Sequence, residues 1–509
     1  MRKQLTLSLL TAVLITFSMP PFRTGFLAYG ALVPFLLLLD PLSMRGALRW
    51  GYITGFIISL GTIHWIWLPT PPGAVAAILV HSAYFMLFAA GYVFLKKRLG
   101  AAAVYFVPFL WTAMEYFKSL GELGFPWVSL GYTQTYYPSL IQYASFTSVY
   151  GVSFWVAVLN VCVYQLFQYR HVMRSVLAYA AAMVLLLLIP FLHGRMVIPD
   201  GGDTQPAETI RVAVVQGNID PYIKWDPQLR ELSFQTYEKL TRAVGRKTVD
   251  LIIWPETATP TYLLHNRQSL TRVLQLYREL ETPILTGTPD YIRLGPNRYK
   301  TFNSVVLLDD SPGRYQTYSK MRLVPFGERV PYEDKLAFLK ALLEKLEMGE
   351  GNFSPGEKQT VFQLSLDRAT NGKQLAFATV ICFESIFPEL VAEFVRRGAR
   401  LMVVVTNDGW FKKTVAPYQH AQMAVFRAIE NRVAIARSAN TGISMTIDPY
   451  GRVRKQTALW QEAVIVDELP LRRELTFFTR YGHVFANGVL LLTVGVLLIV
   501  FIENKVRKE

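Results

Sequence analysis

The sequence predicts an α/β domain held between membrane-spanning helices. Hydrophobic residues make up 52% of the 509 residues, and they concentrate in the first 195 residues and in 484–502. This distribution is typical of membrane segments on either side of a water-exposed domain. Between them, short apolar strands alternate with amphipathic helices, as in an α/β fold. We therefore expect transmembrane helices 1–7 over 1–195, an extracytoplasmic domain over 196–475, and an eighth helix with a cytoplasmic tail over 476–509.

Eight apolar stretches approach the length of roughly 17–25 residues that a helix needs to cross a bilayer. They lie at about 5–19, 24–40, 50–69, 73–95, 101–117, 148–169, 174–193 and 484–502. The first is short and follows Arg2 and Lys3, as the core of a signal peptide would. No small-residue cleavage site follows it, and Pro20-Pro21 leads directly into the next apolar run. We therefore expect an uncleaved first helix.

Basic residues predict which connections face the cytoplasm. Alternate connections carry twelve Lys and Arg residues, namely Arg2, Lys3, Arg45, Arg49, Lys96, Lys97, Arg98, Arg170, Arg174, Lys505, Arg507 and Lys508. Both termini are then cytoplasmic, and residues 194–483 lie outside. The same cytoplasmic segments hold three acidic residues, Asp40, Glu503 and Glu509, so their net charge is +9 of the net +15 of the chain. Topology thus explains much of the positive charge, and nucleic-acid binding is not expected.

The central domain is predicted to alternate strands with helices. Strands are expected at 211–216, 250–254, 284–288, 301–308, 315–319, 375–381, 401–405, 443–447 and 453–457. Helices are expected at 231–244, 270–280, 336–346, 388–397 and 419–436. Asp448-Pro449-Tyr450-Gly451 predicts a hairpin turn. The sequence contains no Gly-rich phosphate loop and no metal-spaced His/Cys cluster, so neither a cofactor nor a metal is expected.

Cys382 is the first candidate for chemistry. The stretch Phe377–Ile381 predicts a buried strand that runs directly into a polar turn at Cys382. The chain has only two cysteines, so a disulfide framework is not possible, and Cys162 lies in an apolar run as a small buried side chain. A free thiol outside the cytoplasm is a liability, which favours a nucleophile at Cys382.

A nucleophilic thiol needs a base, and it needs a group that stabilises the oxyanion. Glu256 follows the predicted strand 250–254 and is a candidate base. Lys320 is a candidate for lowering the thiol pKa and stabilising the oxyanion, and Glu328 could orient it. His265 and His420 are the histidines well inside the domain. Neither makes a strong Cys–His pair, and we expect both to be structural.

Together, three stretches resemble the Glu–Lys–Cys motifs of the nitrilase superfamily. They are Trp254-Pro255-Glu256, Lys320 with Pro325-Phe326-Gly327-Glu328, and Cys382-Phe383-Glu384. The resemblance implies a nitrilase-like α-β-β-α sandwich over 196–475. It implies Glu256 as general base, Lys320 as oxyanion stabiliser and Cys382 as nucleophile. Glu328 and Glu384 become auxiliary catalytic residues.

With its membrane segments, the whole chain resembles the apolipoprotein N-acyltransferase family. Further stretches fit that family: Glu115-Tyr116, Gly124-Phe125-Pro126-Trp127, Gln216-Gly217-Asn218, Trp225 and Asn407-Asp408-Gly409-Trp410-Phe411. The resemblance implies ping-pong transfer of an acyl chain from a membrane phospholipid, typically phosphatidylethanolamine, through a Cys382 thioester. The acceptor is the α-amine of the diacylglyceryl-cysteine that begins an apolipoprotein. It also implies a multi-pass protein of the bacterial inner membrane with a periplasmic catalytic domain.

Aromatic residues near the predicted strand ends are candidates for lining a lipid entrance, although such residues are core about as often. They are Trp225, Phe326, Phe383 and Trp410. Two positions depart from the family. Phe383 stands where Tyr is frequent, so that a hydroxyl is missing, and Gly409 stands where Ala is expected.

Two other functions fit parts of the sequence. A membrane-anchored, nitrilase-like amidase would need one anchor, and eight spans are predicted. A non-catalytic lipid-binding or transport protein would be expected to have a broken Glu–Lys–Cys set, whereas Glu256, Lys320 and Cys382 are all present. The positions of the basic residues argue against a nucleic-acid partner.

Overall fold

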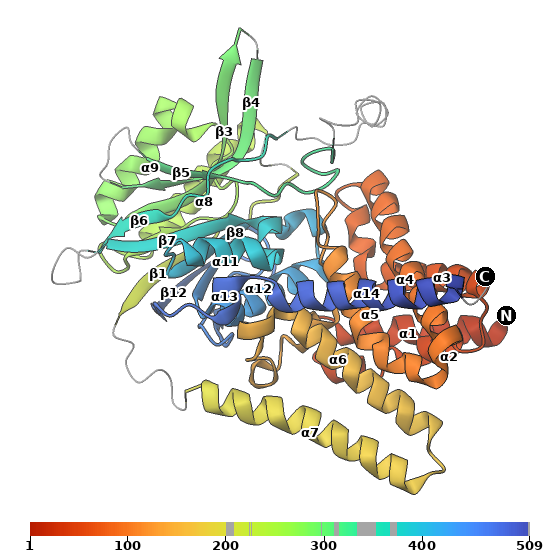
Figure 1. Cartoon of the computed structure of the whole chain (residues 1–509). Coiled ribbons are helices and arrows are strands. Elements are labelled where there is room, and N and C mark those ends of the chain that lie inside the picture. Colours follow the sequence, from red (N-terminus) through yellow and green to blue (C-terminus); the bar gives the residue numbers. More distant parts are fainter. Residues whose placement is uncertain are drawn as a thin grey trace. The chain divides into compact units, whose positions relative to one another are not determined.

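The computed structural model describes residues 1–199, 208–222, 224, 226–296, 298–309, 315–332, 353–366 and 374–506 (Figure 1). The chain divides into two compact units. The helical unit comprises Met1–Trp67, Pro71–Ile198 and Tyr481–Glu509, and the α/β unit comprises Leu68–Thr70 and Pro199–Arg480. Trp225 and the helix predicted at 336–346 lie outside the described residues.

The helical unit is built from largely apolar helices. They are α1 (Arg2–Ser18), α2 (Val33–Leu39), α3 (Met44–Ile63), α4 (Pro71–Leu99), α5 (Val107–Phe117), α6 (Ala144–Gln168), α7 (Met173–Val197) and α14 (Val484–Val506). Within the described residues, four helical segments are long and apolar enough to cross a membrane: Pro71–Phe117, Ala144–Gln168, Met173–Val197 and Val484–Glu503. The prediction of eight spans is therefore wrong in number.

The structure has fewer candidate spans than predicted because several of the apolar runs are short, broken or charged. α1 has 17 residues, at the lower limit of the roughly 17–25 that a crossing needs. The run at 24–40 splits into a 3₁₀ turn, Gly25–Tyr29, and α2 of 7 residues. α3 contains Arg45 and Arg49, which lower its hydropathy. The runs at 73–95 and 101–117 fall in one helical segment of 47 residues.

The α/β unit contains two six-stranded mixed sheets, of order β12-β1-β2-β3-β4-β5 and β11-β10-β9-β8-β7-β6. The strands are β1 (Thr209–Gln216), β2 (Leu251–Ile253), β3 (Ile284–Gly295), β4 (Arg298–Leu308), β5 (Gln316–Ser319), β6 (Phe362–Ser365), β7 (Gln374–Ile381), β8 (Leu401–Thr406), β9 (Ala434–Ala439), β10 (Met445–Ile447), β11 (Val453–Gln456) and β12 (Ala463–Pro470). Pairing is parallel along β1-β2-β3 in the first sheet and along β7-β8-β9 in the second.

A pair of helices packs on each sheet. α8 (Pro227–Arg242) and α9 (Arg267–Leu280) contact the first sheet, and α11 (Pro388–Arg396) and α12 (Ala416–Asn431) contact the second (Figure 1). β1 contacts β9 and β4 contacts β7, so the two sheets face each other. The predicted α-β-β-α sandwich is confirmed. The short helix α13 (Phe477–Tyr481) follows β12 along the chain.

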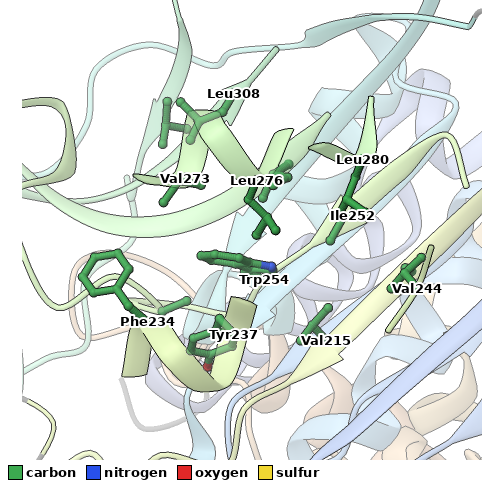
Figure 2. Packing of buried hydrophobic residues seen from close by; sticks show 14 of the residues in the cluster. Val215, Phe234, Tyr237, Val244, Ile252, Trp254, Val273, Leu276, Leu280 and Leu308 are labelled. Carbon is green, nitrogen blue, oxygen red and sulfur yellow. The ribbon is translucent and has the colours of Figure 1, made fainter. Parts of the chain in front are cut away.

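Trp254 lies in the core between the first sheet and its helices (Figure 2). Its fully buried ring stacks on Tyr237 of α8 with 5.1 Å between ring centroids, and its Nε1 donates to Thr241 Oγ1 at 2.9 Å. Leu276 of α9 and Ile252 of β2 belong to the same cluster. A buried aromatic ring that is also hydrogen-bonded is strongly fixed, so the chain leaves this core toward Glu256 from a rigid position.

The sequence-based prediction missed three strands, β6, β9 and β12. The helix predicted over 419–436 ends at Asn431, because Arg432 adopts a left-handed φ of 49°. The apolar run that follows forms β9, an inner strand of the second sheet, since a short apolar run cannot be assigned to helix or strand by periodicity alone. β6 and β12 were not expected at all: β6 has only 4 residues, and β12 carries Asp467 and Glu468.

Candidate active site

The predicted site residues follow strands of both sheets. Glu256 lies shortly after β2, and Lys320 lies directly after β5, both in the first sheet. Cys382 lies directly after β7 in the second sheet. Ligands of α/β proteins commonly bind beyond the carboxyl ends of strands. This arrangement explains why residues 126 positions apart in sequence, Glu256 and Cys382, share one site.

Cys382 begins the 3₁₀ turn Cys382–Ile386, and its backbone is left-handed, with a φ of 52°. A non-glycine residue rarely adopts this conformation, which costs on the order of 1–3 kcal/mol and persists only where the surroundings hold it. Ser385 is placed to hold it, because its Oγ lies within donating distance of the Cys382 carbonyl oxygen, at 2.8 Å. Cys382 as a whole residue is half-buried.

Glu384 is fully buried and connects the Cys382–Ile386 turn to the segment after Lys320. Its Oε1 accepts from the Tyr318 hydroxyl at 2.7 Å and from the backbone N–H groups of Met321 and Arg322 at 2.6 and 3.1 Å. Its Oε2 accepts from the Ile381 N–H at 2.8 Å. Burial raises the pKa of Glu384, and these donors oppose the increase. The contacts of Glu384 thus suit a residue that positions the loops around the thiol.

Lys320 lies between two carboxylates. Its side chain is only 1% exposed, and its Nζ is 2.8 Å from Glu328 Oε1 and 3.7 Å from Glu256 Oε1. Glu328 is held in turn, because its Oε2 accepts from the Val324 N–H at 2.8 Å. A buried lysine is costly unless it is paired, and here both partners are the carboxylates that the motifs predicted.

Asn303 of β4 joins the two carboxylates and was not predicted. Its Nδ2 donates to Glu256 Oε1 at 2.7 Å and to Glu328 Oε1 at 3.3 Å. The pairing of β4 with β5 brings it there, since the Lys320 N–H donates to the Asn303 carbonyl at 2.8 Å. The sequence offered one sign of this residue, a single amide side chain within an apolar strand. Without knowledge of which residues pair between β4 and β5, that sign does not link Asn303 to the site.

Buried charges shift the pKa values of the thiol and the ammonium. Burial raises the pKa of Cys382, the charges of Glu256 and Asp408 raise it further, and Lys320 with a hydrogen bond from Thr406 lowers it. Burial alone would lower the pKa of Lys320, but Glu328 and Glu256 raise it well above its ordinary value. These shifts favour a neutral thiol and a charged lysine in the resting site. Such a thiol must lose its proton to a base as it reacts.

His420 of α12 lies close to Cys382, which the sequence did not predict. Its Nε2 is 3.1 Å from the Cys382 carbonyl oxygen, and its Nδ1 is 2.8 Å from Asp408 Oδ1. Asp408 follows β8, and Arg437 of β9 donates to its Oδ2 at 2.8 Å. These residues come from three adjacent parallel strands, since Cys382 follows β7, Asp408 follows β8 and Arg437 lies in β9.

Cys382, Asp408 and His420 also form, among the described residues, a group of three potential metal ligands with donor atoms within 4.8 Å of one another. The Asp408 oxygens already accept from Thr406, His420 and Arg437, and the positive charge of Arg437 opposes a cation at that position. The surroundings thus do not favour a metal ion.

The predicted lining residues differ in their surroundings. Phe383 is only 5% exposed and packs edge-on against Phe387, with 5.2 Å between ring centroids, as a core residue does. Phe326 is half-buried with a left-handed φ of 62°. Trp410 is half-buried and packs edge-on against Tyr222 at 5.2 Å. Trp225 lies outside the described residues.

Two family models match the chain. The model described as the apolipoprotein N-acyltransferase N-terminal domain matches residues 11–162, and the model described as carbon-nitrogen hydrolase matches residues 211–474. The second range contains Glu256, Lys320, Glu328, Cys382 and His420.

Similar proteins cover nearly the whole chain. An apolipoprotein N-acyltransferase of Geobacter metallireducens is 37% identical over 501 residues, which are 95% of this chain and 93% of that protein. One of Chlorobaculum tepidum is 34% identical over 523 residues, which are 99% of this chain and 97% of that protein. Among solved structures, Saccharomyces cerevisiae Nit3, a member of branch 10 of the nitrilase superfamily, is 20% identical. It covers 52% of this chain and 91% of its own, with a TM-score of 0.38.

Proposed function

This chain belongs to the apolipoprotein N-acyltransferase family, and on that premise we propose that it N-acylates apolipoproteins by a ping-pong reaction through Cys382. The donor is a membrane phospholipid, with phosphatidylethanolamine as the expected one. The acceptor is the free α-amine of a diacylglyceryl-cysteine at the start of an apolipoprotein.

In the first half-reaction, Glu256 takes the Cys382 proton as the sulfur attacks an acyl ester carbonyl of the phospholipid. The C–S bond forms, the ester C–O bond breaks, and the proton passes from Glu256 to the departing glycerol oxygen. The charged ammonium of Lys320 stabilises the oxyanion of the tetrahedral intermediate. The products are an acyl-thioester enzyme and a lysophospholipid.

In the second half-reaction, the acceptor amine attacks the thioester. An α-amine has a pKa of about 7.7–8.0, so part of it is neutral and nucleophilic near pH 7. The C–N bond forms, the C–S bond breaks, and Glu256 carries the amine proton to the departing sulfur. Cys382 is again a neutral thiol, and the enzyme is ready for a second donor.

Three further residues, Glu328, Asn303 and Glu384, act by positioning Glu256, Lys320 and Cys382. Glu328 and Asn303 hold Lys320 and Glu256, as their hydrogen bonds indicate. Glu384 supports the turn that presents Cys382. Trp225, Phe326 and Trp410 are proposed as the apolar lining for acyl chains, and Phe383 is proposed to contribute packing beneath them.

A lipid donor and a lipid-anchored acceptor both require an active site at a membrane. Three candidate spans precede the α/β unit and one follows it. If each crosses once, the α/β unit lies on the opposite side from both termini. The basic residues that precede or separate these spans, Arg2, Lys3, Arg45, Arg49 and Arg170, place the termini in the cytoplasm. The α/β unit is therefore proposed to face the periplasm of a bacterial inner membrane.

The observation that carries this proposal is the pairing of the buried Lys320 with Glu256 and Glu328. Lys320 and Glu256 also interact electrostatically with the Cys382 thiol. The test is to purify the protein from membranes, digest it, and weigh the Cys382 peptide before and after hydroxylamine. We expect a hydroxylamine-labile acyl mass on the Cys382 peptide, and the Cys162 peptide serves as the control without one. A Cys382 peptide that is unmodified even with a slow acceptor would contradict the thioester mechanism.

A further inference from the structure

His420 uses both ring nitrogens next to the nucleophile. The side chain is 1% exposed. Its Nδ1 lies 2.8 Å from Asp408 Oδ1, and its Nε2 lies 3.0 Å from Ser385 Oγ and 3.1 Å from the Cys382 carbonyl oxygen. The Cys382 sulfur also lies within 4.8 Å of a donor atom of this histidine. The ring thus touches the backbone of the strained turn and approaches its sulfur.

The protonation of Nδ1 follows from its partner. Burial alone would raise the pKa of Asp408, but Arg437 and His420 hold it down to about 2. Asp408 is therefore an anion that can only accept hydrogen bonds. Arg437 Nη2 also lies 3.2 Å from Nδ1, but it donates to Asp408 Oδ2 at the shorter distance of 2.8 Å. A bare Nδ1 lone pair at 2.8 Å from the Asp408 carboxylate would be repelled, so we assign a proton to Nδ1.

Nε2 then has two possible states, which differ by one proton. In the neutral ring, Nε2 accepts the Ser385 hydroxyl hydrogen, and its lone pair also faces the Cys382 carbonyl oxygen. In the imidazolium, Nε2–H donates to the Cys382 carbonyl, and Ser385 is free to donate to the same oxygen, from which it lies 2.8 Å. The number of donors on the Cys382 carbonyl thus depends on the His420 proton.

We propose that His420 is a positioning residue for Cys382, which holds the carbonyl of the nucleophile turn and, when protonated, places a cation beside the sulfur. This inference rests on the proposed function, in which Cys382 is the nucleophile. It adds a further ionisable partner to the thiol, from the helix that packs on the second sheet, in addition to Glu256 and Lys320, which follow strands of the first sheet.

The charged surroundings determine the pH at which His420 changes state. Asp408, after β8, favours the imidazolium, while Arg437 of β9 disfavours it. Cys382 faces the ring from its turn, and the thiol in turn interacts with Glu256 and Lys320. Burial and Arg437 lower the pKa of His420 below its ordinary value, so the imidazolium forms on the acid side of neutrality.

The test is the rate at which Cys382 reacts with 2,2′-dipyridyl disulfide in the full-length protein in detergent, in a Cys162→Ser background. The range is about pH 4 to 9, which brackets the ordinary His pKa near 6.5. Thiolate concentration falls as pH falls, but formation of the imidazolium lowers the thiol pKa and slows that fall. We expect a shoulder in the profile below pH 6.5. Its absence would overturn the inference.

Two variants move the shoulder in different ways. His420→Gln keeps a donor of similar reach but cannot gain a charge, so the shoulder should disappear. Ser385→Ala removes the hydroxyl that stabilises the neutral ring, so the shoulder should move to higher pH. If His420→Gln fails to fold, the Ser385→Ala profile decides the matter, and an unmoved shoulder there contradicts the inference.

His265 provides the matched control, because its Nε2 lies 2.8 Å from Asp290 Oδ1 of β3 in the first sheet, whereas Cys382 follows β7 in the second sheet. His265→Gln should leave the profile unchanged. In acyl-transfer assays, His420→Gln should lower kcat with little change in KM for phospholipid, because the residue acts on the attacking thiol and not on the lipid. If Cys382 is acylated but its pH profile of reactivity is the same with and without His420, this inference alone is refuted. If Cys382 is not acylated, the proposed function is refuted.

Discussion

Glu256 and Glu328 both pair with Lys320, and Glu256 and Lys320 act electrostatically on the Cys382 thiol. Glu256 then has two opposing effects on that thiol. It is the proposed base for the attack on the lipid ester, and its charge also raises the pKa of Cys382. The two effects can be separated because only the first requires a proton acceptor.

Glu256→Gln should therefore change two rates in opposite directions. Acyl transfer from phospholipid should fall by about 10²–10⁴-fold, because general-base catalysis is lost. Alkylation of Cys382 by iodoacetamide at mildly alkaline pH should become faster, because the thiol pKa is lowered. Both rates are measured on the same purified protein. A parallel loss of both would mean that the substitution damaged the site rather than removed the base.

Asn303 is predicted to matter through the carboxylates that it joins. Asn303→Ala removes a buried donor from Glu256 and Glu328 and should lower kcat by about 10–100-fold, the equivalent of roughly 1–3 kcal/mol. The control is Asn266→Ala, which removes the N-cap that accepts from Ser269 N–H at 2.9 Å. That variant should lose about 1 kcal/mol of stability and keep its kcat. Equal kcat values for the two variants would contradict the role of Asn303.

At the scale of elements, the segment after β8 depends on close packing around Gly409. A Cβ on Gly409 would lie 2.5 Å from Thr441 Oγ1 and 2.7 Å from Pro221 Cδ, so an alanine requires a backbone shift. Gly409→Ala should destabilise the α/β unit by about 1–3 kcal/mol, as overpacking does. Its melting temperature is the measurement. Gly295→Ala, where a Cβ meets nothing within 4 Å, is the control and should be neutral. An unchanged melting temperature for Gly409→Ala would contradict the packing argument.

At the scale of the whole molecule, the four candidate spans and the basic connections predict a periplasmic α/β unit. Single cysteines at Ser43, His171 and Lys300, on a background without Cys162 and Cys382, test this with a membrane-impermeant maleimide. Lys300, in the exposed part of β4, should be labelled in spheroplasts, and Ser43 and His171 only after the membrane is opened. The opposite pattern would place the α/β unit in the cytoplasm and exclude the proposed orientation.

Much of the fold was predictable because strands and helices of the α/β unit have strong local patterns. β7 and β8 are apolar runs of 8 and 6 residues that end in polar turns, and both were predicted nearly to the residue. β9 was not, because its apolar run continues the amphipathic pattern of α12 and only the left-handed Arg432 separates them. The count of spans failed for a related reason: hydropathy alone does not show where a helix breaks.

The sequence by itself determined the chemical groups of this protein, namely one thiol at a strand end and the Glu–Lys–Glu set of Glu256, Lys320 and Glu328. Each of these follows a recognisable strand or motif, so local patterns carry the signal. Only the tertiary structure showed that Asn303 joins the two carboxylates and that His420 reaches the Cys382 carbonyl. These contacts depend on strand register and on helix packing across distances of 25 to 47 residues. Such long-range geometry leaves no local mark in the sequence.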